Sequence, residues 1–217
     1  MGLMAIREKL AKRAKKAGLG PSLDVISGLE AYFGLLAKWN EKVSLTSLPV
    51  SESGEEAIDR LLIEPLVAAK YLPGPSSTVM DVGSGGGSPA IPMKISTPGI
   101  SLRMVESKTR KAAFLREVVR QLGLTQTAVE TARFEELLAR PELHESADVV
   151  TMRAVRAERR ILMGLQAFLK PGGRLFLFRT GAMTGETELV DHPLYWEASH
   201  SLLPHLRSRL AVFRKFQ

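Results

Sequence analysis

The sequence of 217 residues contains no cysteine. This absence excludes disulfides, thiolate zinc sites, iron–sulfur clusters and any reaction that uses a cysteine nucleophile. It is typical of proteins in a reducing compartment, and we expect a cytoplasmic location. The four histidines lie in separate segments without the spacing of metal ligands, so no bound metal is expected.

Long hydrophobic runs are also missing. No apolar segment approaches the roughly 20 residues that span a bilayer, and the N-terminal stretch MGLMAIREKLAKRAKKAGLG lacks the apolar region of a secretory signal. We therefore expect neither a membrane span nor a leader, and we expect a monomer. The net charge of +7 favours an anionic partner, with nucleic acid as the first candidate.

The first third of the chain has helical periodicity. A short basic helix is expected over residues 3–17, and apolar residues recur at three- and four-residue steps from Ser22 to Trp39 and from Glu55 to Lys70. Pro65 predicts a kink in the last of these helices. We interpret residues 1–74 as a helical N-terminal extension.

From Thr78 onward, apolar strands alternate with amphipathic helices. The strands are TVMDV, SLRMVE, TAVET, ADVVTM and RLFLFR, and the segments WEASHSLL and RLAVFRK predict a terminal antiparallel hairpin. This succession indicates an α/β domain over residues 75–217 with a mostly parallel, Rossmann-like sheet and helices on both faces.

A glycine loop follows the first expected strand, in the run TVMDVGSGGGSPAIP at residues 78–92. Gly83 and Gly85 fit the first two positions of a dinucleotide fingerprint, but Ser88 occupies the third, and the Lys of a P-loop is missing. Asp81 lies one residue before the end of the strand, where a carboxylate suits a cationic amino-acid ligand better than a pyrophosphate. S-adenosylmethionine is the favoured ligand. A tight structural turn without a ligand is the alternative.

Two further segments are expected to complete this pocket. Glu106 ends the second strand, 25 positions after Asp81, where an acid can accept hydrogen bonds from both ribose hydroxyls; alone it would be a solvated strand end. After the third strand, Phe134 and Glu135 are expected beside the adenine, with Phe134 as an apolar wall and nearby backbone amides reading the base edge. Core packing is the alternative for Phe134.

The fourth strand lacks the Asn/Asp-Pro-Pro-aromatic motif that activates exocyclic amines, and ends instead in Thr151-Met152-Arg153. The absence of cysteine excludes carbon methylation through a thiol adduct. A target that is already nucleophilic remains, such as N7 of guanine, which needs alignment but no general base. No catalytic base is therefore assigned. Arg153 directly follows an apolar strand and is expected in the donor pocket.

Short runs along the chain resemble one family in order and spacing. They are LAKWN at 36–40, LTS at 45–47, PAIP at 89–92, ES at 106–107, RK at 110–111, FL at 114–115, RFEE at 133–136, RA at 153–154 and PGG at 171–173. These runs are similar to the bacterial 16S rRNA guanine-N7 methyltransferases, formerly called glucose-inhibited division protein B. The similarity covers about residues 22–180.

The resemblance implies a class I S-adenosylmethionine-dependent methyltransferase fold with a helical extension. It implies that Gly83, Ser88, the pair Phe134–Glu135 and Arg153 bind the donor, and that the substrate is a guanine in 16S rRNA of the small ribosomal subunit. The chain departs from the family pattern mainly on the expected substrate side, at Ser44, Leu61, Glu64–Pro65, Ser84, Ser88–Pro89–Ala90 and Arg179–Thr180–Gly181.

These departures leave alternatives open. A methyltransferase of the same fold could act on another RNA, a protein or a small molecule, or the chain could be an RNA-binding relative with a degenerate donor pocket. Arg153 and Arg179 are the candidates for positioning the substrate. A basic rim around the pocket is expected to contact RNA phosphates, with ordinary surface charge as the alternative: Arg153, Arg156, Arg159, Arg160, Arg110, Lys111 and the N-terminal lysines.

Overall fold

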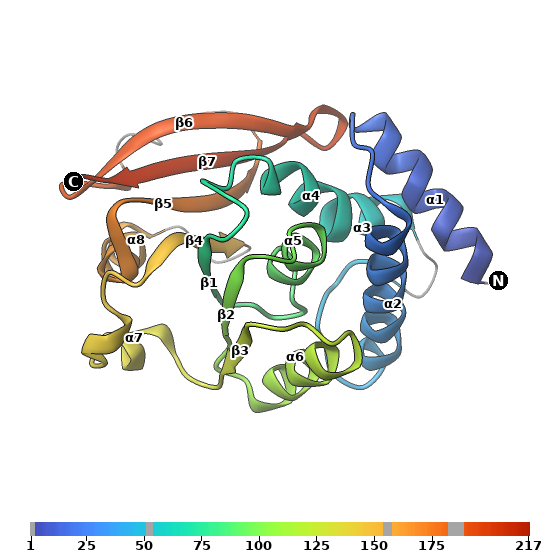
Figure 1. Cartoon of the computed structure of the whole chain (residues 1–217), viewed down its shortest axis with the longest axis horizontal. Helices are drawn as coiled ribbons and strands as arrows, with labels where there is room; N and C mark the ends of the chain where they lie inside the picture. Colours follow the sequence, from blue (N-terminus) through green and yellow to red (C-terminus); the bar gives the residue numbers. More distant parts are fainter. Residues whose placement is uncertain (1–2, 51–53, 154–157, 182–188) are drawn as a thin grey trace.

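The computed structural model describes residues 3–50, 54–153, 158–181 and 189–217. Its centre is a seven-stranded sheet of order β3-β2-β1-β4-β5-β7-β6 (Figure 1). The first five strands run parallel, and β7 runs antiparallel to both β5 and β6. The strands are β1 (Thr78–Val82), β2 (Ser101–Val105), β3 (Thr127–Glu130), β4 (Ala147–Arg153), β5 (Leu169–Thr180), β6 (Leu194–Leu203) and β7 (Ser208–Lys215).

The strand order confirms the Rossmann-like fold and the terminal hairpin predicted from the sequence. The chain moves outward from β1 to β3, returns to β4 beside β1, and continues outward, so the carboxyl ends of β1 and β4 meet where the direction reverses. Ligands of open α/β sheets bind at this switch point. The fold therefore places the glycine loop at the expected binding edge.

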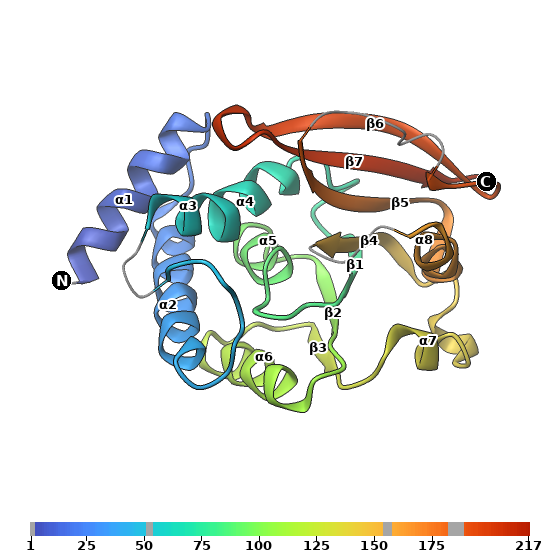
Figure 2. The ribbon, with the colours of Figure 1, turned by 180° about the vertical axis from the view of Figure 1, so that it is seen from behind.

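Helices cover both faces of the sheet, as Figures 1 and 2 show. Because neighbouring strand residues face opposite sides, Val79 belongs to the core on one face and Met80 to the core on the other. The helices are α1 (Leu3–Lys16), α2 (Leu23–Asn40), α3 (Glu55–Ile58), α4 (Glu64–Ala69), α5 (Ala90–Ser96), α6 (Thr109–Gln121), α7 (Phe134–Leu137) and α8 (Arg159–Leu165), with a π-helical turn η1 (Asp59–Ile63) and 3₁₀ turns η2 (Pro141–Leu143), η3 (Gln166–Phe168) and η5 (Pro204–Leu206).

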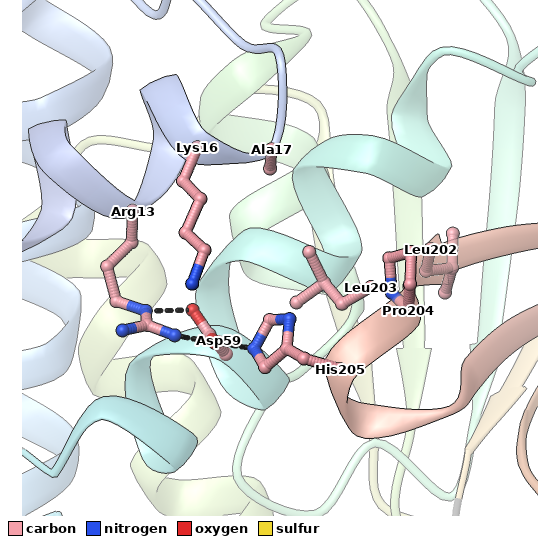
Figure 3. Close-up of a pocket in the computed structure, with 8 residues that line it drawn as sticks. All are labelled: Arg13, Lys16, Ala17, Asp59, Leu202, Leu203, Pro204 and His205. Carbon is pink, nitrogen blue, oxygen red and sulfur yellow. Dashed lines mark hydrogen bonds and ion pairs between the residues drawn. The ribbon is translucent and has the colours of Figure 1, made fainter.

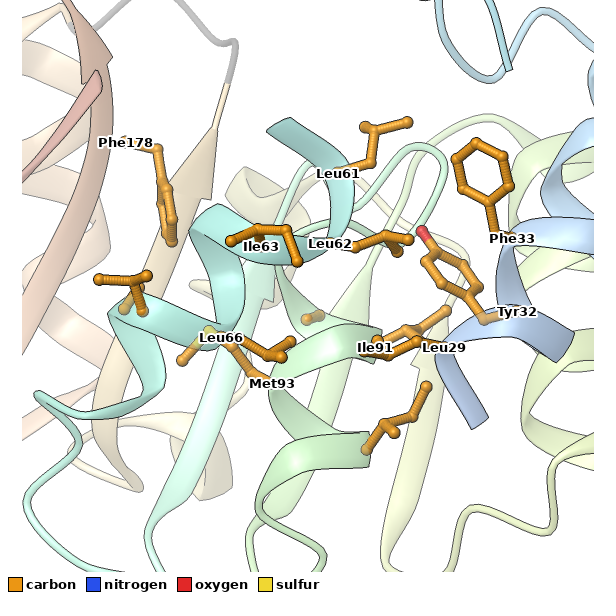
Figure 4. Packing of buried hydrophobic residues seen from close by; sticks show 14 of the residues in the cluster. Leu29, Tyr32, Phe33, Leu61, Leu62, Ile63, Leu66, Ile91, Met93 and Phe178 are labelled. Carbon is orange, nitrogen blue, oxygen red and sulfur yellow. The ribbon is translucent and has the colours of Figure 1, made fainter. Parts of the chain in front are cut away.

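The N-terminal helices share a core with the sheet. Ser22 caps α2, since its hydroxyl accepts a hydrogen bond of 3.3 Å from the backbone N–H of Val25. The buried face of α2 then packs in one cluster with α4, α5 and the Val79 face of the sheet. Figure 4 shows Tyr32 of α2 beside Leu62 and Ile91 within this cluster. Residues before 75 thus contribute directly to the packing beneath the glycine loop.

The helix predicted over Glu55–Lys70 is divided by the π-helical turn η1. The N–H of Glu64 bonds to the carbonyl of Asp59, five residues back, instead of to Arg60. Pro65 follows at once and has no N–H, so it cannot donate to the carbonyl of Arg60 or of Leu61. Two helical carbonyls consequently depend on partners outside the helix.

Asp59 of η1 is a buried carboxylate that contacts α1 and η5, two segments far apart in the sequence. Asp59 is 2% exposed and accepts hydrogen bonds from the guanidinium of Arg13 on α1 and from Nε2 of His205 on η5, the latter at 2.6 Å (Figure 3). The three residues line a cavity of about 380 Å³ together with Lys16 and apolar side chains. Segments almost two hundred residues apart in the chain meet at this carboxylate.

Candidate functional site

The glycine loop turns back over the end of β2. The N–H groups of Gly83 and Ser84 both donate to the carbonyl of Val105, at 2.9 and 3.1 Å. Gly83 and Gly85 have φ values of +76° and +52°, a region that favours glycine. The turn thereby exposes loop backbone at the carboxyl edge of the sheet.

Two cavities open at this edge, with volumes of about 410 and 270 Å³. Gly83, Glu106 and Ser107 line both, so the cavities are neighbours on either side of the end of β2. The larger, which we call the loop cavity, is also lined by Leu36, Leu45, Thr46, Leu61, Ser84, Gly85, Gly86, Ser88, Lys108, Lys111 and Arg153. The smaller, the Phe134 cavity, is also lined by Val82, Val105, Ala132, Arg133, Phe134, Glu135, Met152 and Ile161.

Asp81 is buried on β1, two residues before Gly83, with 1% exposure, and it is not part of the described lining of either cavity. One carboxylate oxygen accepts a hydrogen bond from the hydroxyl of Thr151 on β4, but Oδ2 has no partner among the described residues. Burial raises the pKa of this carboxyl above its ordinary value, and the Thr151 bond and the positive charge of Arg153 counteract part of that rise. An unpaired buried oxygen is costly, and a cationic donor would satisfy it.

Glu106 links the two sides of the site. Its Oε2 accepts a hydrogen bond of 2.9 Å from the N–H of Gly85, and its Oε1 accepts one of 2.7 Å from the N–H of Lys108. The side chain is buried and fixes the glycine loop against the start of α6. It lies between the two cavities, as a residue that contacts the middle of a long ligand would.

Phe134 and Glu135 both line the smaller cavity, at the start of α7. The Phe134 ring is half-buried and packs on the Cα of Gly164 in α8, where a Cβ would lie 3.2 Å from the ring. Phe134 thus combines the two readings of the sequence, because one part of its ring contacts the core and another lines the cavity. Glu135 is exposed.

Arg153 ends β4 and reaches back to the helix that precedes β1. Its guanidinium donates to the carbonyl of Arg60 and, at 2.7 Å, to Oε2 of Glu64, and it lies 4.5 Å from the ring centroid of Phe178. Burial lowers the pKa of Arg153, and the carboxylate of Glu64 opposes this shift. Nε of Arg153 and Oε1 of Glu64 are buried without hydrogen-bond partners in the described part of the chain.

Ser88 lines the loop cavity, but its hydroxyl is already engaged. It donates a hydrogen bond of 2.8 Å to the carbonyl of Leu61. Arg153 and Ser88 therefore donate hydrogen bonds to the carbonyls of Arg60 and Leu61, the two carbonyls that Pro65 leaves without a donor from within the helix. Both side chains were expected to bind S-adenosylmethionine. In the structure, each forms hydrogen bonds to the divided helix and holds it beside the site.

Sequence reasoning missed three supporting residues. The hydroxyl of Tyr32 donates to the carbonyl of Gly86 at 2.5 Å, and Oδ1 of Asn40 accepts from the N–H groups of Leu45 and Thr46 at 2.9 and 3.0 Å. Burial raises the pKa of Tyr32, so its hydroxyl stays protonated as a donor. Tyr32 looked like an ordinary apolar helix position, and Asn40 appeared only as part of the family run. Glu64 appeared only as a departure from the family pattern.

The expected basic rim is only partly assembled. Lys111 lines the loop cavity, whereas Arg179 does not belong to the described lining of either cavity. Arg159 pairs with Asp191, and Arg160 is exposed. Arg156 lies outside the described residues. No described helix is long and apolar enough to cross a membrane, and the described residues hold no cluster of three potential metal ligands.

Comparison with solved structures supports the fold. The chain is similar to a SAM-dependent methyltransferase from Aquifex aeolicus (TM-score 0.53, 17% identity, 74% of this chain and 93% of that one). It is also similar to a putative methyltransferase from Escherichia coli (TM-score 0.57, 12% identity, 71% of this chain and 86% of that one). At these identities the similarity shows the fold alone.

Sequence comparisons are more specific. Ribosomal RNA small subunit methyltransferase G of Dichelobacter nodosus is 37% identical over 176 residues, covering 81% of this chain and 80% of the relative. The protein of the same name from Neisseria gonorrhoeae is 35% identical over 172 residues, covering 78% of each. The family model described as rRNA small subunit methyltransferase G (GidB) matches residues 25–208. The chain therefore belongs to the rRNA small subunit methyltransferase G family.

Proposed function

We propose that the chain transfers a methyl group from S-adenosylmethionine to N7 of a guanine in 16S rRNA, in the cytoplasm. Membership of the family supports a methyltransferase acting on small-subunit rRNA. A ring nitrogen as the acceptor is supported by two features of the sequence: the fourth strand lacks the motif that activates exocyclic amines, and the chain has no cysteine.

The residues present fit the donor. The unpaired Oδ2 of buried Asp81 is the observation that carries this assignment, because the carboxylate, once ionised, can pair with the cationic methionine end. Glu106 would contact the ribose from its place between the cavities, and Phe134 with Glu135 would flank the adenine. Gly83, Gly85 and Ser88 would lie along the methionine, and Arg153 would approach its carboxylate or the incoming nucleotide.

S-adenosylmethionine supplies an electrophilic methyl group on a sulfonium. The protein needs only to align the guanine lone pair with that group and to exclude water, since N7 loses no proton. Aliphatic side chains of Leu36, Leu45 and Leu61 border the loop cavity and keep it partly apolar. No described residue needs to act as a general base, and Arg153, which lines the loop cavity, is the first candidate for positioning the substrate. Arg179 remains a second candidate for positioning, from the end of β5.

The test is a methylation map of 16S rRNA. We expect that a strain lacking the chain loses one N7-methylguanine, and that the gene restores it. The Asp81→Ala variant, which removes the donor carboxylate, is expected not to restore it. Purified protein should also bind S-adenosylmethionine in calorimetry. An unchanged map in the deletion strain would refute rRNA methylation, while absent donor binding would favour a degenerate RNA-binding relative.

A further inference from the structure

A second groove lies on the surface beside the donor site and is not part of it. It has a volume of about 550 Å³ and lies between the end of α2 and the start of α6. Its walls are Lys38, Trp39, Lys42, Val43, Arg110 and Ala113. We call it the Trp39 groove.

Trp39 is the aromatic side chain among the residues that line this groove. Its indole is half-buried and packs against Phe114 of α6, with ring centroids 5.7 Å apart and an interplanar angle of 57°. This contact fixes the indole from behind, and the rest of the ring faces the groove together with Val43 and Ala113. The groove therefore offers a rigid aromatic platform of the kind on which nucleobases stack.

Three cations surround the platform. Lys38, Lys42 and Arg110 are exposed, and none forms an ion pair or side-chain hydrogen bond within the described part of the chain. Arg120, near the other end of α6, is in contrast paired with Glu117. An aromatic floor with unpaired cations complements a ligand that combines flat bases with negative charges.

The groove and the loop cavity are lined by neighbouring residues of three segments. On α6, Arg110 lines the groove and Lys111 the loop cavity. On α2, Trp39 lines the groove and Leu36, one turn earlier, the loop cavity. In the loop after α2, Val43 lines the groove and Leu45 lines the loop cavity. Asn40 holds this loop in place through its two backbone hydrogen bonds.

We propose that the Trp39 groove binds a single-stranded RNA segment next to the nucleotide that is methylated. One base stacks on Trp39, and Lys38, Lys42 and Arg110 contact the neighbouring phosphates. The inference rests on the proposed function, and it adds a subsite that presents the target nucleotide to the loop cavity. Contacts of this type tolerate different bases, so the groove contributes affinity and register more than base selection.

Tryptophan fluorescence tests the stacking directly. The chain has two tryptophans, so the Trp196→Phe variant leaves Trp39 as the only fluorophore. We expect saturable quenching when this variant is titrated with oligoadenylate of about eight nucleotides. Inorganic polyphosphate supplies charge without bases and should not quench. Absent quenching by the RNA, or equal quenching by polyphosphate, would overturn the assignment.

Methylation kinetics test the role of the subsite. In Trp39→Ala, Lys42→Glu and Arg110→Glu we expect KM for the small subunit to rise about fivefold or more, the lower bound for losing one base stack. Donor affinity and kcat should stay close to wild type, because these side chains lie outside the loop cavity. Trp39→Ala could raise KM by misfolding, because Trp39 is half-buried. Lys42 and Arg110 are exposed, so their charge-reversal variants test the groove without that risk.

Arg207→Glu is the matched control. Arg207 is exposed in the turn between β6 and β7. Figures 1 and 2 show this turn at the upper edge of the molecule and α6 at the lower edge, so the charge reversal should leave KM unchanged. An unaltered KM in both charge-reversal variants, with active wild-type enzyme, would refute the groove and leave the proposed function intact. Inactive wild-type enzyme would instead refute the function itself.

Discussion

The hydroxyl of Ser88 donates a hydrogen bond to the carbonyl of Leu61, which is the carbonyl that Pro65 would serve if it had an N–H. A residue of the glycine loop thus completes the backbone of a helix from the N-terminal extension. Arg153 does the same for the carbonyl of Arg60, from the end of β4. The donor site and the divided helix are consequently one hydrogen-bonded unit.

Ser88→Ala removes the first of these links. We expect a loss of about 1–3 kcal/mol of unfolding free energy, because a partly buried carbonyl loses its only side-chain donor. Urea unfolding measures the change, and Ser201→Ala, at an exposed position of β6, is the control, with an expected effect within about 0.5 kcal/mol. Equal stability of the two variants would show that water replaces the hydroxyl.

Glu64→Gln tests the buried pair with Arg153. Glu64 is 3% exposed, so removal of its charge leaves a guanidinium with little solvent compensation, and we expect a cost of about 3–5 kcal/mol. A double-mutant cycle with Arg153→Met measures the coupling of the two side chains. We expect the double variant to be more stable than the sum of the single losses predicts. Simple additivity would mean that the two charges do not stabilise each other.

Asp81 predicts an unusual pH dependence. Its pKa is raised in the folded protein, so the protonated carboxyl favours folding, and this contribution is lost as pH rises from the ordinary value through the raised one. Asp81→Asn should therefore stabilise the ligand-free protein at neutral pH and flatten its stability over that range. Thermal melts at several pH values provide the measurement. Stability that falls in Asp81→Asn at neutral pH would contradict the assignment of a penalised carboxylate.

The affinity for S-adenosylmethionine should rise with pH, whereas the contribution of Asp81 to stability falls with pH. A cationic ligand needs the ionised carboxylate, so affinity is expected to increase as pH rises through the raised pKa of Asp81. In Asp81→Asn, calorimetry should detect no donor binding. A pH-independent affinity in the wild type would mean that the methionine end binds elsewhere.

Tyr32→Phe isolates the support of the glycine loop by α2. The variant loses only the hydroxyl that donates to the carbonyl of Gly86, and we expect donor affinity to fall about fivefold, as for the loss of roughly 1 kcal/mol. Tyr71→Phe is the control, since Tyr71 stacks on His200 and its hydroxyl has no hydrogen-bond partner in the described structure. A similar loss in both variants would indicate a general packing defect.

RNA binding should depend strongly on salt. If about four to six phosphates are contacted, the logarithm of the binding constant should fall against log salt with a slope of about −3 to −5. Lys42→Gln should reduce the magnitude of that slope by about one, and Arg207→Gln should not change it. Filter binding between low and physiological salt measures the slope. A flat response in the wild type would exclude a phosphate-based interface.

The elements that were predicted correctly depend on neighbours in sequence. The strand-loop run around Asp81 and Gly83 and the alternation after Thr78 identify the binding edge, because backbone geometry at a strand end is a local property. The hydrogen bonds from Tyr32 to Gly86 and from Arg153 to Glu64 join residues 54 and 89 positions apart and leave no periodic signal. For the same reason Ser88 looked like a ligand contact and not like a partner of Leu61.

Asp59 pairs with two residues that are synthesised at different times, Arg13 and His205. Its carboxylate is buried between Arg13 of α1 and His205 of η5, which lie 192 positions apart in the sequence. Because His205 follows Asp59 by 146 positions, the pair of Asp59 with Arg13 can form during translation before His205 has been synthesised. The corner is complete only after the β6–β7 hairpin has been made, and two distant segments are then bound to one residue. Loss of either partner would leave the Asp59 carboxylate with one cation fewer.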